Sequence, residues 1–303
     1  MDDISGRALK TDLVRDARED ERRGCIDSNV FSKVPIQDCF KTTGDAPIST
    51  RWVDINKGDD ANPNYRSRWV GRDFKGNDND RDDLFAATPP LEAKKLLISS
   101  AASQLGKPYV QQKRLNFIDI KKAYFNAFAK RDLYVQLPDE FLEPGEKGKV
   151  CGKLNFSLYG TRDAASNWEA HYTNVLRGLG FTRGLTSPCV FYHKDRDIET
   201  VVHGDDFTSL AVESQLVWFT NELEKVLKIS NRGILGPEKH HVQEIRLLNR
   251  ILAWDNDGIR YEADQRHAEI LVDAFKLSDA KGVETPGVKP TKDDEGKDVG
   301  EST

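Results

Sequence analysis

The stretch that decides the fold is Glu199-Thr-Val-Val-His203-Gly204-Asp205-Asp206-Phe-Thr-Ser-Leu-Ala-Val212, which predicts two strands joined by a tight turn. Glycine tolerates the positive φ that short hairpin turns require, and β-branched and aromatic residues suit the flanking strands. The adjacent carboxylates of Asp205 and Asp206 repel each other, so they favour a bound cation, and hard divalent ions such as Mg²⁺ take oxygen ligands. The alternative is a solvated turn, because Asp is a common turn residue. The tripeptide taken alone favours that alternative.

A second acidic residue, Asp119, ends the apolar, strand-like run Leu115-Asn-Phe-Ile-Asp119. Asp is depleted in strands, so a carboxylate at this strand end indicates a specific role. If Asp119 faces the turn at Asp205 and Asp206, the three carboxylates form a site that suits two cations and an in-line displacement at phosphorus. The alternative is that Asp119 is an N-cap or turn residue before the helix-compatible segment 121–128.

A basic run lies upstream at Tyr65-Arg-Ser-Arg-Trp-Val-Gly-Arg72. In a strand, Arg66, Arg68 and Arg72 share one face, and a row of guanidinium groups suits phosphate oxygens. An ordinary solvated strand face is the alternative. The net charge of the chain is −5, but binding to a nucleic-acid backbone needs local rather than total positive charge.

Length and composition indicate a globular chain with a substantial core. The chain has 303 residues, of which 38% are hydrophobic and 31% charged, so one large domain or two or three subdomains are expected. No apolar run is long enough to span a bilayer, and the polar start predicts no secretory signal. The four cysteines are scattered, which predicts free thiols and an intracellular location.

Helical and strand patterns alternate irregularly along the chain, which predicts an α+β fold. Residues 1–50 are charged and predict an N-terminal extension with a helix at 12–23, and residues 289–303 predict a disordered tail. Trp168 and Tyr172 fall at helical spacing and are expected in the core. The other expected elements are a hairpin over 51–76, a helix over 91–105 with Leu96 and Leu97 on its apolar face, a strand over 116–120, helices capped by Ser166 and Ser214, a hairpin around 255–258 and a helix ending at Phe275.

Several motifs occur together in one order, and together they resemble the reverse transcriptases of Copia-type (Pseudoviridae-like) long-terminal-repeat retrotransposons. The resemblance covers roughly residues 51–286, and its ordered agreement is stronger than any single motif. The motifs are Asp119-x-x-x-Ala123-Tyr124, Ser157-Leu-Tyr-Gly160 and Gly204-Asp205-Asp206, together with Arg51-Trp-Val53, 65–72, 134–141, Ser187-Pro-Cys-Val-Phe191, 261–270 and Thr285-Pro286.

The resemblance implies a right-hand polymerase fold with fingers, an antiparallel-sheet palm and at best a partial thumb. It divides the chain into an extension (1–50), fingers and palm (51–216), a palm- and thumb-side connection (217–286) and a flexible tail (287–303). The palm strands are expected near 115–120 and 199–212.

The resemblance also implies the activity of an RNA-directed DNA polymerase that uses two metal ions. Asp119 and Asp205 are expected to bridge two Mg²⁺ ions, for which Mn²⁺ can substitute, while Asp206 assists and the carbonyl of Ile120 adds a ligand. The run containing Arg66, Arg68 and Arg72 is expected to lie over the incoming triphosphate. The implied partners are an RNA or DNA template with its primer and deoxynucleoside triphosphates, with no membrane.

Tyr124 separates two classes of polymerase. In reverse transcriptases an aromatic residue at this spacing packs under the sugar and excludes a 2′-hydroxyl. Viral RNA-dependent RNA polymerases also carry Gly-Asp-Asp, but they favour a polar residue near that position to recognise the 2′-hydroxyl. The alternative is that Tyr124 and Phe125 are core aromatics, as one of them is expected to be.

Three departures from the family pattern stand out. His203-Gly204 replaces the usual Tyr-Val, and Asp163 replaces a Gln expected near the nucleotide and template, so Arg162 is considered as its compensating charge. Leu248-Asn249 replaces the Leu-Gly expected in the later hairpin, which weakens a primer-gripping assignment there. His240 and His241 are adjacent, so on a strand they point apart, and no metal role is assigned to them.

Two other functions remain open from the sequence. One is a catalytically decayed or repurposed retroelement protein that binds nucleic acid, although all three acidic residues are present. The other is a different magnesium-dependent phosphoryl-transfer enzyme or an RNA polymerase, against which Tyr124 and the ordered motifs argue.

Overall fold

The protein has the predicted mixture of helices and antiparallel strands, so the α+β class is confirmed. The computed structural model describes residues 1–59, 61–74, 86–104, 106–247, 250–255, 257–262 and 265–282. The expected tail at 287–303 and the Leu248-Asn249 pair lie outside these residues. Over the described residues, no helix is both long and apolar enough to cross a bilayer.

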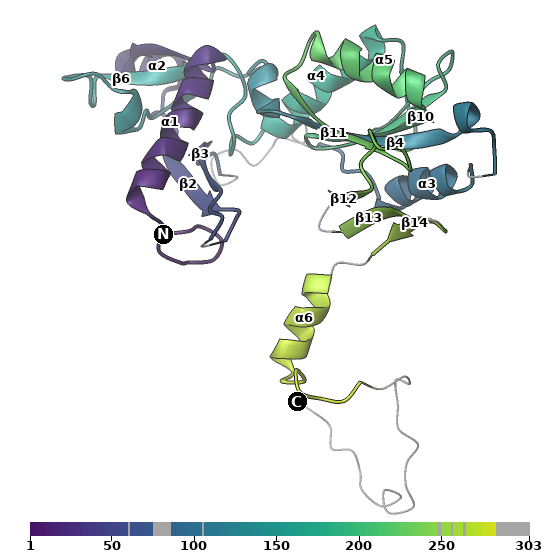
Figure 1. The fold of residues 1–303 in the computed structure, drawn as a ribbon. Helices are drawn as coiled ribbons and strands as arrows, with labels where there is room; N and C mark the ends of the chain where they lie inside the picture. The colour runs from purple at the N-terminus through teal and green to yellow at the C-terminus, as the bar shows by residue number, and fades with distance from the viewer. Residues whose placement is uncertain are drawn as a thin grey trace, which may run out of the picture.

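A six-stranded antiparallel sheet forms the centre of the larger body (Figure 1). Two adjacent inner strands contain Asp119 and Asp206, and both are buried along most of their length, because their apolar runs are covered on both faces. The strand order is β11 (Ile229–Leu235), β4 (Lys113–Ile120), β10 (Asp206–Val212), β9 (Ile198–His203), β8 (Val190–His193) and β7 (Thr182–Arg183).

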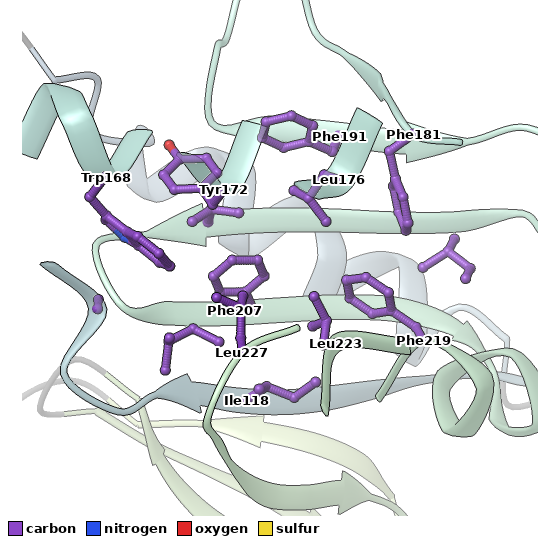
Figure 2. Close-up of a cluster of buried hydrophobic side chains, with 14 of the residues drawn as sticks. Ile118, Trp168, Tyr172, Leu176, Phe181, Phe191, Phe207, Phe219, Leu223 and Leu227 are labelled. Atoms are coloured by element: carbon purple, nitrogen blue, oxygen red, sulfur yellow. The ribbon is translucent and has the colours of Figure 1, made fainter. Parts of the chain in front are cut away.

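Helices α4 (Ala164–Gly178) and α5 (Glu213–Glu224) cover one face of this sheet (Figure 1). Their apolar stripes meet the sheet in a cluster that includes Trp168, Tyr172, Phe207 and Phe219 (Figure 2). The predicted helical stripe is therefore core. Asp163 rather than Ser166 precedes the first helical residue of α4, and α5 begins one residue before Ser214.

Helix α3 (Leu91–Ala102) and the three-stranded sheet β12–β13–β14 lie on the opposite face (Figure 1). Leu97 packs there with Phe117 of β4 and Leu210 of β10. The prediction for the apolar face of α3 is partly wrong, because Leu96 is 64% exposed while Lys94 is buried. The strands of the second sheet are β12 (Glu244–Leu247), β13 (Arg250–Asp255) and β14 (Gly258–Tyr261).

The predicted hairpin over 51–76 is present as β2 (Thr50–Asn56) and β3 (Tyr65–Gly71), and it belongs to a smaller body with the first 50 residues (Figure 1). Helix α1 contacts this hairpin through the ion pair between Arg18 and Asp54, 2.6 Å long. Residues 1–50 thus pack as part of the fold. The other elements of this body are α1 (Thr11–Asp27), β1 (Phe31–Pro35), α2 (Ile36–Thr43), β5 (Tyr134–Val135) and β6 (Val150–Leu154), with the sheet order β1–β6–β5.

The last described helix, α6 (Gln265–Ala274), stands away from both bodies (Figure 1). It ends one residue before the predicted boundary at Phe275. The four cysteines are buried free thiols, as predicted.

Candidate active site

The structure brings the three predicted carboxylates together at one end of the central sheet. Strands β4 and β10 pair so that Asp119 lies directly opposite Asp206, and Cβ atoms of residues paired in this way are about 4.5–5.5 Å apart. The backbone N–H of Ile120 donates to the carbonyl of Asp205 at 2.9 Å. The end of β4 is thereby tied to the turn, and the carboxylates of two strands far apart in the sequence form one cluster.

The turn that holds Asp205 is shaped by its glycine and held by a tryptophan. Gly204 has a φ of 63°, in the left-handed region that favours glycine. The indole Nε1 of Trp168 donates to the carbonyl of Gly204 at 2.8 Å. The helical spacing of Trp168 predicts only a core position for it. A signal was available, because a buried indole N–H needs a hydrogen-bond partner.

Burial and mutual repulsion make the charged forms of these carboxylates unfavourable. Burial, and then the neighbouring charges of Asp205 and Asp206, raise the pKa of Asp119 above its ordinary value. Burial and the charge of Asp205 likewise raise the pKa of Asp206. A bound cation would relieve this repulsion, so the site is built to attract positive charge.

Cations of the chain offset only part of this negative charge. Arg232 on β11 lies with its Nη1 3.7 Å from Oδ1 of Asp206, and Arg66 acts against the raised pKa of Asp119. Lys94 is only 2% exposed, and its Nζ has no hydrogen-bond partner among the described residues. Burial lowers the pKa of Lys94, while Asp206 opposes that shift. Lys94 was not among the predicted site residues, although its position within an apolar helical run is a visible signal.

A cavity of about 200 Å³ opens beside the carboxylate of Asp205. The rings of Tyr124 and Tyr159 are 5.1 Å apart, and the guanidinium of Arg68 lies 5.1 Å from the ring centre of Tyr159. Burial raises the pKa of Tyr159 to about 12. Phe125, by contrast, is 4% exposed and belongs to the core. The lining residues are Arg68, Ala123, Tyr124, Tyr159, Trp168, Gly204 and Asp205.

The predicted basic row is divided between two places. Arg66 and Arg68 lie on β3, where residues two apart share a face. Arg72 lies past the end of the strand, with its guanidinium 5.6 Å from the ring centre of Phe74. It lines a separate cavity together with Arg51. Arg66 and Arg68 are thus the two members nearer the carboxylates.

Asp163 does not line the cavity beside Asp205. Its side chain is 5% exposed, and its Oδ1 accepts from Nη2 of Arg131 at 2.9 Å. Asn167 donates to its other oxygen at 3.1 Å. The predicted contact with the nucleotide therefore finds no direct geometric support, because a buried carboxylate needs a counter-charge and this one uses Arg131. Arg131, which the sequence did not indicate, supplies a counter-charge for Asp163, and compensation by Arg162 stays a prediction.

His240 and His241 do not point apart, because they lie in a turn and not in a strand. The two Nε2 atoms lie 2.8 Å and 3.2 Å from the carboxylate oxygens of Glu213. The backbone N–H of Glu238 donates to Nδ1 of His241 at 3.2 Å, so the neutral ring of His241 bears its proton on Nε2. That proton faces Glu213, which favours a hydrogen-bonded clamp over a metal site.

Two comparisons with known proteins agree with this geometry. A family model described as reverse transcriptase (RNA-dependent DNA polymerase) matches residues 39–289. The retrovirus-related Pol polyprotein from transposon TNT 1-94 of Nicotiana tabacum is 24% identical over 250 residues. The match covers 80% of this chain and 18% of that polyprotein, so the chain spans less than a fifth of its relative. The resemblance seen in the motifs is confirmed, and the chain belongs to the reverse transcriptase (RNA-dependent DNA polymerase) family.

Proposed function

We propose that this chain is the polymerase part of a retrotransposon Pol polyprotein and extends a primer on an RNA template. The observation that carries the proposal is the register that sets Asp119 opposite Asp206, with Asp205 in the adjoining turn. A solvated turn would not need a second strand to deliver a third carboxylate to the same place. The family match supports the same reaction class.

We infer that the three carboxylates would hold two magnesium ions. Carboxylate oxygens are the ligands that Mg²⁺ prefers, and the raised pKa values of Asp119 and Asp206 mark charge that the protein leaves unbalanced. We assign Asp119 and Asp205 as the main ligands, with Asp206 and the carbonyl of Ile120 as secondary ones. When bound, Mg²⁺ or Mn²⁺ would activate the primer 3′-hydroxyl and neutralise the leaving pyrophosphate.

The residues around the cavity would bind and orient the nucleotide. Guanidinium groups bind phosphate oxygens in a fixed geometry, and Arg66 and Arg68 lie on the hairpin nearest the carboxylates. Arg72 would contact the same triphosphate only from the neighbouring cavity. We assign Tyr124 to the floor under the sugar, because it lines the cavity next to Asp205 and its ring is braced by Tyr159. A ring in that place leaves no room for a 2′-hydroxyl.

The parts of a right-hand polymerase can be assigned to the two bodies. We assign the six-stranded sheet with α4 and α5 to the palm and the β2–β3 hairpin to the fingers, with 217–286 as the palm- and thumb-side connection. The pairing of β1 with β6 adds residues 31–35 to the fingers side, so the division at residue 50 does not separate two bodies. The template with its primer and a deoxynucleoside triphosphate would then meet between palm and fingers.

Primer extension on poly(rA)·oligo(dT) with Mg²⁺ or Mn²⁺ tests the proposal, with Asp205→Asn beside the native chain. We expect extension by the native chain alone. Asp195→Asn is a matched control, since Asp195 is an exposed acid in the loop at the other end of β9. No extension with intact template-primer binding would contradict the proposal and favour a decayed protein that only binds nucleic acid.

A further inference from the structure

A buried ion cluster lies outside the carboxylate site and has no role in the mechanism above. A single nitrogen, Nη2 of Arg131, bridges two carboxylates, 2.6 Å from Oδ2 of Asp73 and 2.9 Å from Oδ1 of Asp163. The two acidic side chains are 9% and 5% exposed. Nε of Arg131 is also buried and has no hydrogen-bond partner among the described residues. The guanidinium therefore contacts these carboxylates through one atom.

This cluster joins two segments that are far apart in the sequence. Asp73 follows the end of β3, and its Oδ2 also accepts the backbone N–H of Arg162 at 3.1 Å. Next to it, the N–H of Gly71 donates to the carbonyl of Tyr159 at 2.7 Å. A Cβ added at Gly160 would lie 2.1 Å from the carbonyl oxygen of Gly71. The end of the β2–β3 hairpin and the loop at 157–163 are thus in direct backbone contact.

The same two segments form one wall of the cavity beside Asp205. The hairpin carries Arg68 and the loop carries Tyr159, and these two side chains stack on each other. On its other side, Asp163 accepts from Asn167, which also donates to the hydroxyl of Ser157 at 3.1 Å. A displacement of either segment at the ion cluster would therefore change the shape of the cavity, which does not contain Arg131 itself.

Among the described residues, the guanidinium of Arg131 is the cation paired with both buried carboxylates. Removing Arg131 would leave two buried acids close together without this partner, which is strongly destabilising for buried ion pairs. Removing the charge of Asp163 leaves a simple pair between Arg131 and Asp73. The effects of the two changes are therefore expected to differ greatly, and the second should repair part of the damage done by the first.

We propose that Arg131 is a positioning residue that holds the β2–β3 hairpin against the loop at 157–163 and so sets the pocket for the incoming nucleoside triphosphate. Asp163 and Asp73 are its counter-charges, one on each of the two segments. The role in nucleotide binding rests on the proposed function, whereas the mechanical junction does not. The position at which the family usually has Gln thus serves this chain through an ion pair.

The test compares Arg131→Gln, Asp163→Asn, the double variant and Arg131→Lys. For Arg131→Gln we expect a rise of about tenfold in the KM for the nucleotide, with a smaller change in kcat, as for lost positioning of substrate. Asp163→Asn should change the KM less than about threefold, and in the double variant it should recover most of the loss. Arg131→Lys should act like the native chain, because one nitrogen makes both contacts. Arg177→Gln, on the exposed end of α4, is the matched control.

Hydrogen exchange at the amides of Gly71 and Arg162 measures the junction without any need for activity. Both amides should exchange faster in Arg131→Gln and return toward native protection in the double variant and in Arg131→Lys. Unchanged exchange and unchanged KM in a folded Arg131→Gln variant would overturn the proposal. If that variant does not fold, failure of Asp163→Asn to restore folding and protection would overturn it instead. An inactive native chain with the expected exchange pattern would refute only the proposed function.

Discussion

Two clusters of neighbouring carboxylates in the described part of the chain have opposite electrostatics. At Asp163 burial alone would raise the pKa, but the hydrogen bond and charge of Arg131 outweigh it, so the pKa is lowered. At Asp119 and Asp206 burial and mutual repulsion prevail, and the pKa values are raised. One cluster therefore has its cation built into the chain, whereas the other is left short of positive charge. This difference is what we expect if the first cluster is structural and the second is the proposed cation site.

Asp205→Asn is expected to give the largest effect among the tests of this contrast. We expect primer extension to fall by at least about 10²–10³-fold, because the site would lose a main ligand of the cations that stabilise developing charge. Steady-state extension rates in Mg²⁺ and Mn²⁺ measure the loss. Asp195→Asn should retain native rates, and equal activity of the two variants would show that the unbalanced cluster is not the reaction centre.

The next effect concerns the sugar pocket beside the unbalanced cluster. Tyr124→Ala should reduce discrimination against ribonucleotides by about tenfold or more, the scale of selectivity that one packing contact supplies. Tyr124→Phe keeps the ring and should keep the discrimination. The ratio of kcat/KM for deoxynucleotides to that for ribonucleotides is the quantity to measure. Unchanged selectivity in Tyr124→Ala would assign the ring to core packing alone.

Lys94→Met tests whether the buried ammonium group of Lys94 destabilises the fold. We expect the free energy of unfolding to increase by about 1–3 kcal/mol at neutral pH, since the native chain buries this cation without a hydrogen bond. Burial lowers the pKa of Lys94 below its ordinary value of 10.5, so between the two values the unfolded chain binds more protons. Native stability should therefore gain from this group as the pH rises through that window. Denaturant titrations at several pH values should show this gain only in the native chain, and a destabilised Lys94→Met would contradict the prediction.

The smallest effect is on the stability of the chain when no metal is bound at the carboxylate cluster. Because the pKa of Asp206 is raised above 3.8, the folded chain binds more protons than the unfolded chain between the two values, and this group lowers stability as the pH rises through them. Asp206→Asn should stabilise the chelator-treated chain at pH 7 by about 0.5–1 kcal/mol, as at other functional sites. Thermal melts with and without Mg²⁺ measure this. If the native chain were more stable than Asp206→Asn in chelator, the charge of Asp206 would already be balanced by cations of the chain.

The elements that the sequence predicted well were those with local signals. The hairpin at Gly204, the strand ending at Asp119 and the aromatic stripe of α4 all follow from periodicity and turn chemistry, and the family motifs brought the three carboxylates into one hypothesis. The residues that were missed depend on tertiary contacts. Neither the pairing of Arg131 with Asp163, 32 positions apart, nor the turn that gathers His240 and His241 on Glu213 has a local pattern. The burial of Lys94 in place of Leu96 reflects how α3 is rotated on the sheet, which its mixed sequence leaves open.

The register between β4 and β10 has a consequence for how the proposed site forms during folding. A slip of one residue would reverse the faces of the slipped strand, so the side chain of Asp119 would point away from that of Asp206 and the carboxylate cluster would be lost. The two strands lie more than 80 positions apart, and contacts of such long range form slowly. Cation binding at the proposed site would therefore require the two strands to be paired correctly. During synthesis the chain would bind no cation there until residues 206–212 have joined the sheet.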